Sequence, residues 1–116
     1  MNIPTIAIEN VPNPLPEGVA VLDVREPDEW AAGHIEGALH IPLGTLPVRV
    51  DEVAALHEHG AAQTLVVCKV GGRSAQAVAY LSQQGYDVVN LAGGMLDWAA
   101  AGRPMVSETG EPAYVG

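Results

Sequence analysis

Short apolar runs along the chain alternate with segments whose apolar residues recur at helical spacing. Two runs rich in β-branched residues, 19–24 and 64–67, have the composition of buried parallel strands. Residues 87–91 form a further strand, and residues 3–8 favour a short edge strand. Residues 39–42 indicate a short strand or an extended segment. We therefore expect strands along the whole length of the chain.

Residues typical of helix ends mark the segments between these runs. Pro27 suits the first turn of a helix that stops at Gly33. Helical spacing predicts further helices over 45–59, 75–82 and 95–101, each followed closely by a glycine of the kind that ends helices. Strands that alternate with helices predict an α/β fold with a parallel sheet. Ligands of such sheets bind beyond the carboxyl ends of the strands.

The length and charge of the chain narrow the classes of protein that it can belong to. Its 116 residues predict one domain over 1–116, since single domains peak at about 100–150 residues. Residues 105–116 are polar and contain Gly and Pro, so we expect a poorly ordered tail. A net charge of −9 argues against nucleic acid and against an anionic membrane surface as partners, and we expect a monomer.

The start of the chain shows no signal peptide, and no apolar run approaches the ~20 residues of a membrane-spanning helix. The single cysteine excludes a disulfide within the chain. A thiol that must stay reduced suits the cytoplasm, where we expect the protein to be.

That cysteine, Cys68, directly follows the strand predicted over 64–67 and precedes a glycine-rich turn into a helix. A lone cysteine is most often a small buried hydrophobic residue. Here, however, Lys69 is the only lysine of the chain, and Arg73 places a second of the five basic residues close by. Backbone N–H groups of such a turn, the helix N-terminus and nearby cations can lower a thiol pKa from ~8.5 to roughly 3.5–7.5. The pattern therefore predicts a nucleophilic thiolate.

This turn resembles the active-site loop of the rhodanese (thiosulfate sulfurtransferase) family, which usually runs Cys-Arg-x-Gly-x-Arg-Ser. The matching segment is Cys68-Lys69-Val70-Gly71-Gly72-Arg73-Ser74. The departure is Lys69, which keeps the charge of the family's arginine but lacks its bidentate fork.

Two further segments are similar to signatures of the same family. The first comprises Asp23-Val24-Arg25, Glu29-Trp30 and Gly33-His34-Ile35-x-Gly37-Ala38, and the second comprises Leu91-x-Gly93-Gly94-x-x-x-Trp98 and Gly102-x-Pro104. The likeness covers about residues 19–104. It implies the rhodanese fold, in which a central parallel sheet of about five strands is flanked by helices on both faces.

The resemblance and the residue types together suggest roles for the candidate site residues. Cys68 is the expected nucleophile, the N–H groups of residues 69–74 would stabilise an anionic sulfur, and Arg73 would hold the loop's shape and add charge. Ser74 would cap the helix, and the resemblance implies that it also faces the persulfide.

Asp23 and Arg25 follow the neighbouring strand and form a candidate supporting pair. We expect them to fix the strand end through hydrogen bonds and an ion pair with Glu29, while the alternative is that Arg25 adds positive potential near the loop. We expect no cofactor. We also expect no metal, because His40, His57 and His59 do not have the spacing of metal ligands.

Three functions are compatible with this loop. The first is a sulfurtransferase that moves a sulfane sulfur from thiosulfate or a similar small anionic donor to cyanide or an external thiol, through a Cys68 persulfide. The second is a persulfide carrier or docking module without turnover. The third is a phosphatase or arsenate reductase of the related cell-cycle type. Loops of that third type hold five residues between Cys and Arg, whereas four intervene here, which suits a single sulfur atom better than a tetrahedral oxyanion.

Overall fold

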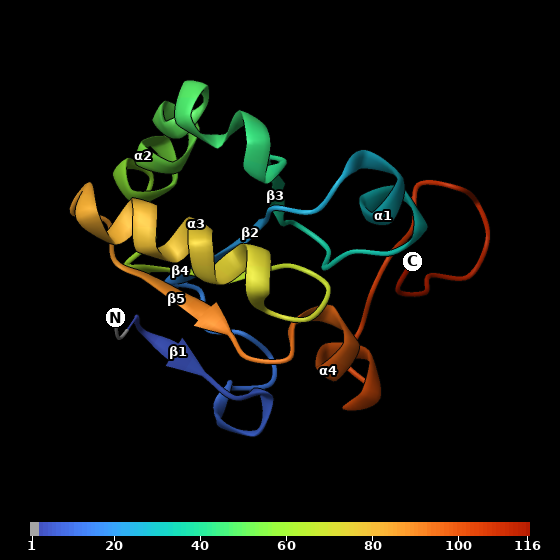
Figure 1. Ribbon diagram of the computed structural model, residues 1–116. Coiled ribbons are helices and arrows are strands. Elements are labelled where there is room, and N and C mark those ends of the chain that lie inside the picture. Colours follow the sequence, from blue (N-terminus) through green and yellow to red (C-terminus); the bar gives the residue numbers. More distant parts are fainter. Residues whose placement is uncertain (1–2) are drawn as a thin grey trace.

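The computed structural model describes residues 3–116, so the first two residues of the predicted domain lie outside the described part. Its centre is a parallel sheet in which five strands follow the order β1-β5-β4-β2-β3 (Figure 1). The strands are β1 (Thr5–Ile6), β2 (Val19–Asp23), β3 (Leu39–His40), β4 (Gln63–Val67) and β5 (Val88–Leu91). The expected sheet of the α/β fold is confirmed.

Strand β4 lies at the centre of the sheet and pairs with β2 on one side and β5 on the other. The register places Asp23, the last residue of β2, opposite Val67, the last residue of β4. Parallel pairing therefore brings the segment that begins at Cys68 next to the segment that begins at Val24, at the carboxyl edge of the sheet.

Helices cover both faces of the sheet, as expected from the resemblance. Helices α2 (Val50–Glu58) and α3 (Gly72–Gln83) cover one face, and α4 (Gly94–Ala100) lies on the other, while α1 (Pro27–Ala32) lies beyond the carboxyl end of β2 (Figure 1). Alternate side chains of the inner strands β2, β4 and β5 enter two separate cores. Leu22, Val66 and Leu81 belong to the core under α2 and α3, and Val21, Leu65 and Trp98 to the core under α4.

Two predicted segments have different bounds in the structure. The first strand covers only Thr5–Ile6 and is therefore shorter than the predicted residues 3–8. Its partner strand β5 ends at Leu91, which pairs with Ile6, and the 3₁₀ turn η1 (Ile8–Asn10) follows in the chain. The helix predicted over 45–59 is two elements, the 3₁₀ segment η2 (Leu43–Val48) and α2. Pro47 lies in η2, and because it has no backbone N–H it cannot donate the hydrogen bond to the Leu43 carbonyl that one continuous α-helix from Leu43 would need.

The C-terminal tail makes defined contacts with the end of α1, although we expected residues 105–116 to be poorly ordered. The N–H of Glu108 donates to the Ala31 carbonyl at 2.9 Å, and that of Tyr114 to the Ala32 carbonyl at 3.1 Å. A Cβ at Gly33 would collide with the Tyr114 carbonyl oxygen, so the absence of a side chain there lets the tail pack closely. Within residues 3–116, no helix has both the length and the hydropathy that crossing a bilayer requires.

Candidate active site

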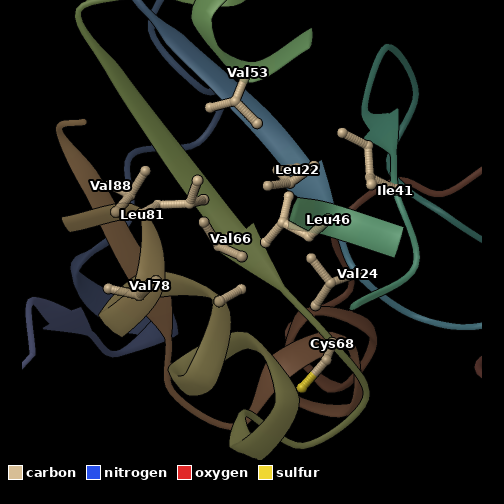
Figure 2. Packing of buried hydrophobic residues seen from close by; sticks show 11 residues of the cluster. Leu22, Val24, Ile41, Leu46, Val53, Val66, Cys68, Val78, Leu81 and Val88 are labelled. Carbon is tan, nitrogen blue, oxygen red and sulfur yellow. The ribbon is translucent and has the colours of Figure 1, made fainter. Parts of the chain in front are cut away.

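Cys68 lies between the end of β4 and the first turn of α3, at one end of the core cluster under α3 (Figure 2). The residue has 0% exposed surface. Burial by itself is typical of an inert structural thiol. The groups around the sulfur distinguish it from such a thiol, because they are hydrogen-bond donors as well as apolar side chains.

Several donors converge on the Cys68 sulfur. The Gly71 N–H donates to Sγ with a distance of 3.1 Å between nitrogen and sulfur, and the Ser74 hydroxyl oxygen lies 3.3 Å from Sγ. Burial raises the pKa of the Cys68 thiol, but hydrogen bonds from the Ser74 hydroxyl and from the N–H groups of Ser74, Gly71 and Val70 outweigh it. The net direction of the pKa is therefore downward, toward a thiolate.

The backbone conformation of Gly71 allows its N–H to face the Cys68 sulfur. Its φ of +105° lies in the left-handed region that side chains rarely adopt, and it directly precedes α3. A Cβ at Gly71 would also lie 3.3 Å from the Gly93 nitrogen and 3.4 Å from the Leu91 carbonyl oxygen. The glycine thus turns its N–H toward the sulfur and lets the loop pack against the chain between β5 and α4.

The start of α4 holds the loop from the other side. The Met95 N–H donates to the Cys68 carbonyl at 2.8 Å, and the Leu96 N–H donates to the Lys69 carbonyl at 3.1 Å. A Cβ at Gly94 would collide with the Cys68 carbonyl oxygen and lie 2.6 Å from that of Lys69. The sequence indicated only a turn at Gly93-Gly94, so this contact between α4 and the loop was not predicted.

Ser74 does not cap α3, which corrects the prediction. Gly71 occupies the N-cap position, and Ser74 lies inside the first turn with its side chain fully buried. The Ser74 hydroxyl donates to Oδ1 of Asn90 at 2.5 Å as well as toward Sγ. Nδ2 of Asn90 donates to the Gly71 carbonyl at 3.3 Å. Asn90 was missed, although a polar residue within the apolar run 88–91 is a recognisable signal.

Arg73 forms a bidentate ion pair with Glu29 of α1, with N–O distances of 2.7 and 2.8 Å. The hydrogen bonds from Arg73 lower the pKa of Glu29 to about 2, against a smaller opposing effect of burial. The same bonds raise the pKa of Arg73. The prediction of an ion pair with Glu29 at Arg25 is therefore wrong, because the Glu29 carboxylate binds Arg73 of the loop.

Arg25 instead pairs with Asp23, and both side chains are fully buried. The Arg25 guanidinium reaches the Asp23 carboxylate at 2.8 Å, and its Nη2 also donates to the Gly33 carbonyl at 2.7 Å. These bonds join the end of β2 to the end of α1. They fit the interpretation that the pair fixes local structure, and Asp23 offsets the positive potential that Arg25 would otherwise add.

Lys69 and Val70 form the outer part of the loop. Val70 is 60% exposed, and Lys69 is half-buried without an ion pair to any carboxylate described in residues 3–116. The other four basic residues are engaged: three arginines pair with carboxylates, and Arg103 donates to backbone carbonyls. Lys69 therefore supplies the uncompensated positive charge closest in sequence to the thiol.

Comparison with known proteins agrees with this geometry. Residues 9–101 match the family model of the rhodanese-like domain. A protein of Allochromatium vinosum named sulfurtransferase is 41% identical over 95 residues, which cover 81% of this chain and 84% of that protein. Thiosulfate sulfurtransferase GlpE of Pseudomonas paraeruginosa is 40% identical over 95 residues, 81% of each chain. The crystal structure of a rhodanese-related protein from Thermoplasma volcanium superposes with a TM-score of 0.71 at 34% identity, over 89% of this chain and 97% of that one.

Proposed function

This chain belongs to the rhodanese-like domain family, and we propose that it transfers a sulfane sulfur from thiosulfate or a similar anionic donor through a persulfide on Cys68. Relatives named as sulfurtransferases support sulfur transfer in general. The observation that carries the finer proposal is the set of donors around the sulfur of the chain's single cysteine.

In the first half-reaction the Cys68 thiolate attacks the outer sulfur of thiosulfate. A new S–S bond forms at Cys68 while the bond between the outer sulfur and the sulfonate breaks, and sulfite leaves with the electron pair. The N–H groups of the loop, which face Sγ in the resting protein, suit the anionic sulfurs of both thiolate and persulfide. Because Cys68 has no exposed surface, the donor reaches it only when part of the loop moves.

In the second half-reaction an external acceptor removes the outer sulfur. Cyanide attacks that sulfur, the S–S bond breaks, thiocyanate leaves, and the Cys68 thiolate is restored. A thiol acceptor would leave as a persulfide in the same way. The acceptor must come from outside, because the chain has no second cysteine that could form a disulfide with the first.

The charges around the loop favour a small sulfur donor over a phosphate ester. Nη1 and Nη2 of Arg73 each donate to the Glu29 carboxylate, so the fork formed by these two nitrogens faces Glu29 and not a ligand. Four residues separate Cys68 from Arg73, which makes the loop smaller than the phosphatase type. Lys69, which has no carboxylate partner in the described residues, is the group that we assign to the departing sulfite.

Steady-state and single-turnover assays test the proposal and separate an enzyme from a carrier. With thiosulfate and cyanide in excess, we expect many equivalents of thiocyanate per protein, and none above background from Cys68→Ser, whose hydroxyl cannot form a persulfide. One equivalent only, released from preloaded protein, would identify a carrier. Turnover by Cys68→Ser would refute the role of Cys68.

A further inference from the structure

Asn90 is a polar residue inside the otherwise apolar strand β5, and it is 5% exposed. Both ends of its side-chain amide bind the loop that surrounds Cys68. Oδ1 accepts a hydrogen bond from the Ser74 hydroxyl at 2.5 Å, and Nδ2 donates to the Gly71 carbonyl at 3.3 Å. The bond to the Gly71 carbonyl fixes the orientation of the amide, so that its oxygen is the atom that faces Ser74.

The Ser74 hydroxyl thus has two acceptors and a single hydrogen. Oδ1 of Asn90 lies 2.5 Å from the hydroxyl oxygen, and Sγ of Cys68 lies 3.3 Å from it. One hydrogen cannot make a good bond to both at the same time. The shorter distance favours the amide oxygen, but a charged acceptor forms the stronger bond, so ionisation of the sulfur favours Sγ.

We propose that Asn90 is a positioning residue that competes with the Cys68 sulfur for the hydrogen of Ser74. When Sγ carries charge, the hydroxyl turns to it. When the charge has left Sγ, the hydroxyl turns back to the amide and remains satisfied in a buried site. In the sulfur transfer proposed above, on which this second step rests, the charge moves to the outer sulfur as the persulfide forms. The hydroxyl therefore has a partner in both states.

The proposal predicts the sign of a change in Cys68 ionisation. Asn90 supports the neutral thiol, because it offers the hydroxyl a good acceptor when the sulfur is uncharged. Without that acceptor the sulfur is the only acceptor left for the hydroxyl, and the thiolate becomes more stable relative to the thiol. Asn90→Leu should therefore lower the pKa of Cys68, but only where Ser74 is present. Its second effect, loss of the bond to the Gly71 carbonyl, does not depend on Ser74.

The test is a double-mutant cycle of wild type, Ser74→Ala, Asn90→Leu and the double variant. The pH dependence of Cys68 alkylation by iodoacetamide gives the thiol pKa of each protein. We expect Asn90→Leu to move the pKa of Cys68 further downward when Ser74 is present than in the Ser74→Ala background, by about half a pH unit. The charged residues of the loop and of the neighbouring strand end, which are Lys69, Arg73 with Glu29, and Asp23 with Arg25, are the same in all four proteins.

Equal shifts in the two backgrounds would overturn the proposal, because a merely structural role of Asn90 moves both alike. Asn90→Ala, which introduces no larger side chain, replaces Asn90→Leu in the cycle if the leucine variant does not show a cooperative thermal transition, and the same sign is expected. Alkylation requires no sulfur donor. A failure of wild type to take up sulfur would therefore count against the proposed function and leave the result of this cycle intact.

Discussion

At the scale of single residues, the chemistry of the site depends on the competition between burial and hydrogen bonding at one sulfur atom. Cys68 has no exposed surface, and burial without donors would favour the neutral thiol. Donors from Ser74, Gly71 and Val70 reverse that preference. The residue is thus a core residue by packing and a nucleophile by its polar contacts.

This balance predicts the pH dependence of thiol reactivity. Because the pKa of Cys68 lies below its ordinary value, the thiolate persists to lower pH in the folded protein than in the unfolded chain. The midpoint of iodoacetamide alkylation should therefore lie below the ~8.5 of a free cysteine, and should return to that value in denaturant. A folded-state midpoint at or above that of the unfolded chain would contradict this account of the donors.

Ser74 and Asn90 also show what sequence reasoning could and could not reach at this scale. The motif located Cys68 and its loop, because each residue contributes through its own type and position. Asn90 was not predicted, since its contribution depends on the packing of α3 against β5, which brings it beside Ser74, sixteen positions earlier in the chain. The same holds for Glu29, whose partner Arg73 is 44 positions along the chain.

At the scale of elements, the start of α4 acts as a support for the loop. Gly94 allows two N–H groups of this helix to bind the Cys68 and Lys69 carbonyls, and a methyl group there would collide with both. Gly94→Ala should therefore move the loop and lower stability by more than about 1 kcal/mol, with a several-fold loss of sulfur uptake. Urea unfolding and thiosulfate loading measure the two effects.

Gly102 offers a matched control for this substitution. It also has a positive φ, +73°, but a Cβ there meets no atom within 4 Å. Gly102→Ala should cost about 1 kcal/mol of backbone strain and leave sulfur uptake unchanged. If both alanine variants load sulfur as wild type does, α4 does not position the loop.

The ion pair between Glu29 and Arg73 links α1 to the first turn of α3. The pKa of Glu29 falls from an ordinary 4.5 to about 2 in the folded protein, so the unfolded chain binds more protons between these values. The resulting stability is present above pH 4.5 and is lost as the pH falls toward 2. Because both side chains are partly exposed, we expect a contribution of only about 1 kcal/mol at neutral pH.

Glu29→Gln tests this link. The variant should be less stable than wild type at pH 7, and the difference in the free energy of unfolding should shrink as the pH falls below 4.5. Glu52→Gln removes the more exposed ion pair with Arg49 and should have a smaller effect at pH 7. A difference in the free energy of unfolding between wild type and Glu29→Gln that grows at acid pH would contradict this account of the ion pair.

At the scale of the whole molecule, the net charge of −9 opposes the approach of a dianion such as thiosulfate. Lys69 is the basic residue of the loop without a carboxylate partner in the described residues, and it directly follows the nucleophile. Lys69→Ala should raise KM for thiosulfate by about three- to tenfold, most at low salt, where repulsion is least screened.

Two comparisons show whether this effect is electrostatic. Lys69→Arg should retain thiosulfate use, because it keeps the charge, and an uncharged sulfane donor should be much less affected by Lys69→Ala. The measurement is kcat/KM for each protein across ionic strength. A Lys69→Ala variant equal to wild type at every salt concentration would show that another group selects the donor.

The overall architecture was more predictable than the contacts of the site. Hydrophobic runs at 19–24 and 64–67 indicated the central strands, since a buried parallel strand needs an apolar run on both faces. The break in the helix expected over 45–59 has a signal in the sequence, because Pro47 lacks the N–H that a continuous helix would use. The packing of the tail on α1 could not be read from its composition, because it depends on backbone hydrogen bonds and on the space beside Gly33.

The central claim is that Cys68 carries the transferred sulfur, and intact mass spectrometry tests it most directly. After incubation with thiosulfate and removal of excess donor, wild type should gain the mass of one sulfur atom and lose it again on addition of cyanide. Cys68→Ser should gain nothing. The claim would be contradicted if wild type with an alkylatable thiol gains no sulfur, or if the Cys68→Ser variant gains one.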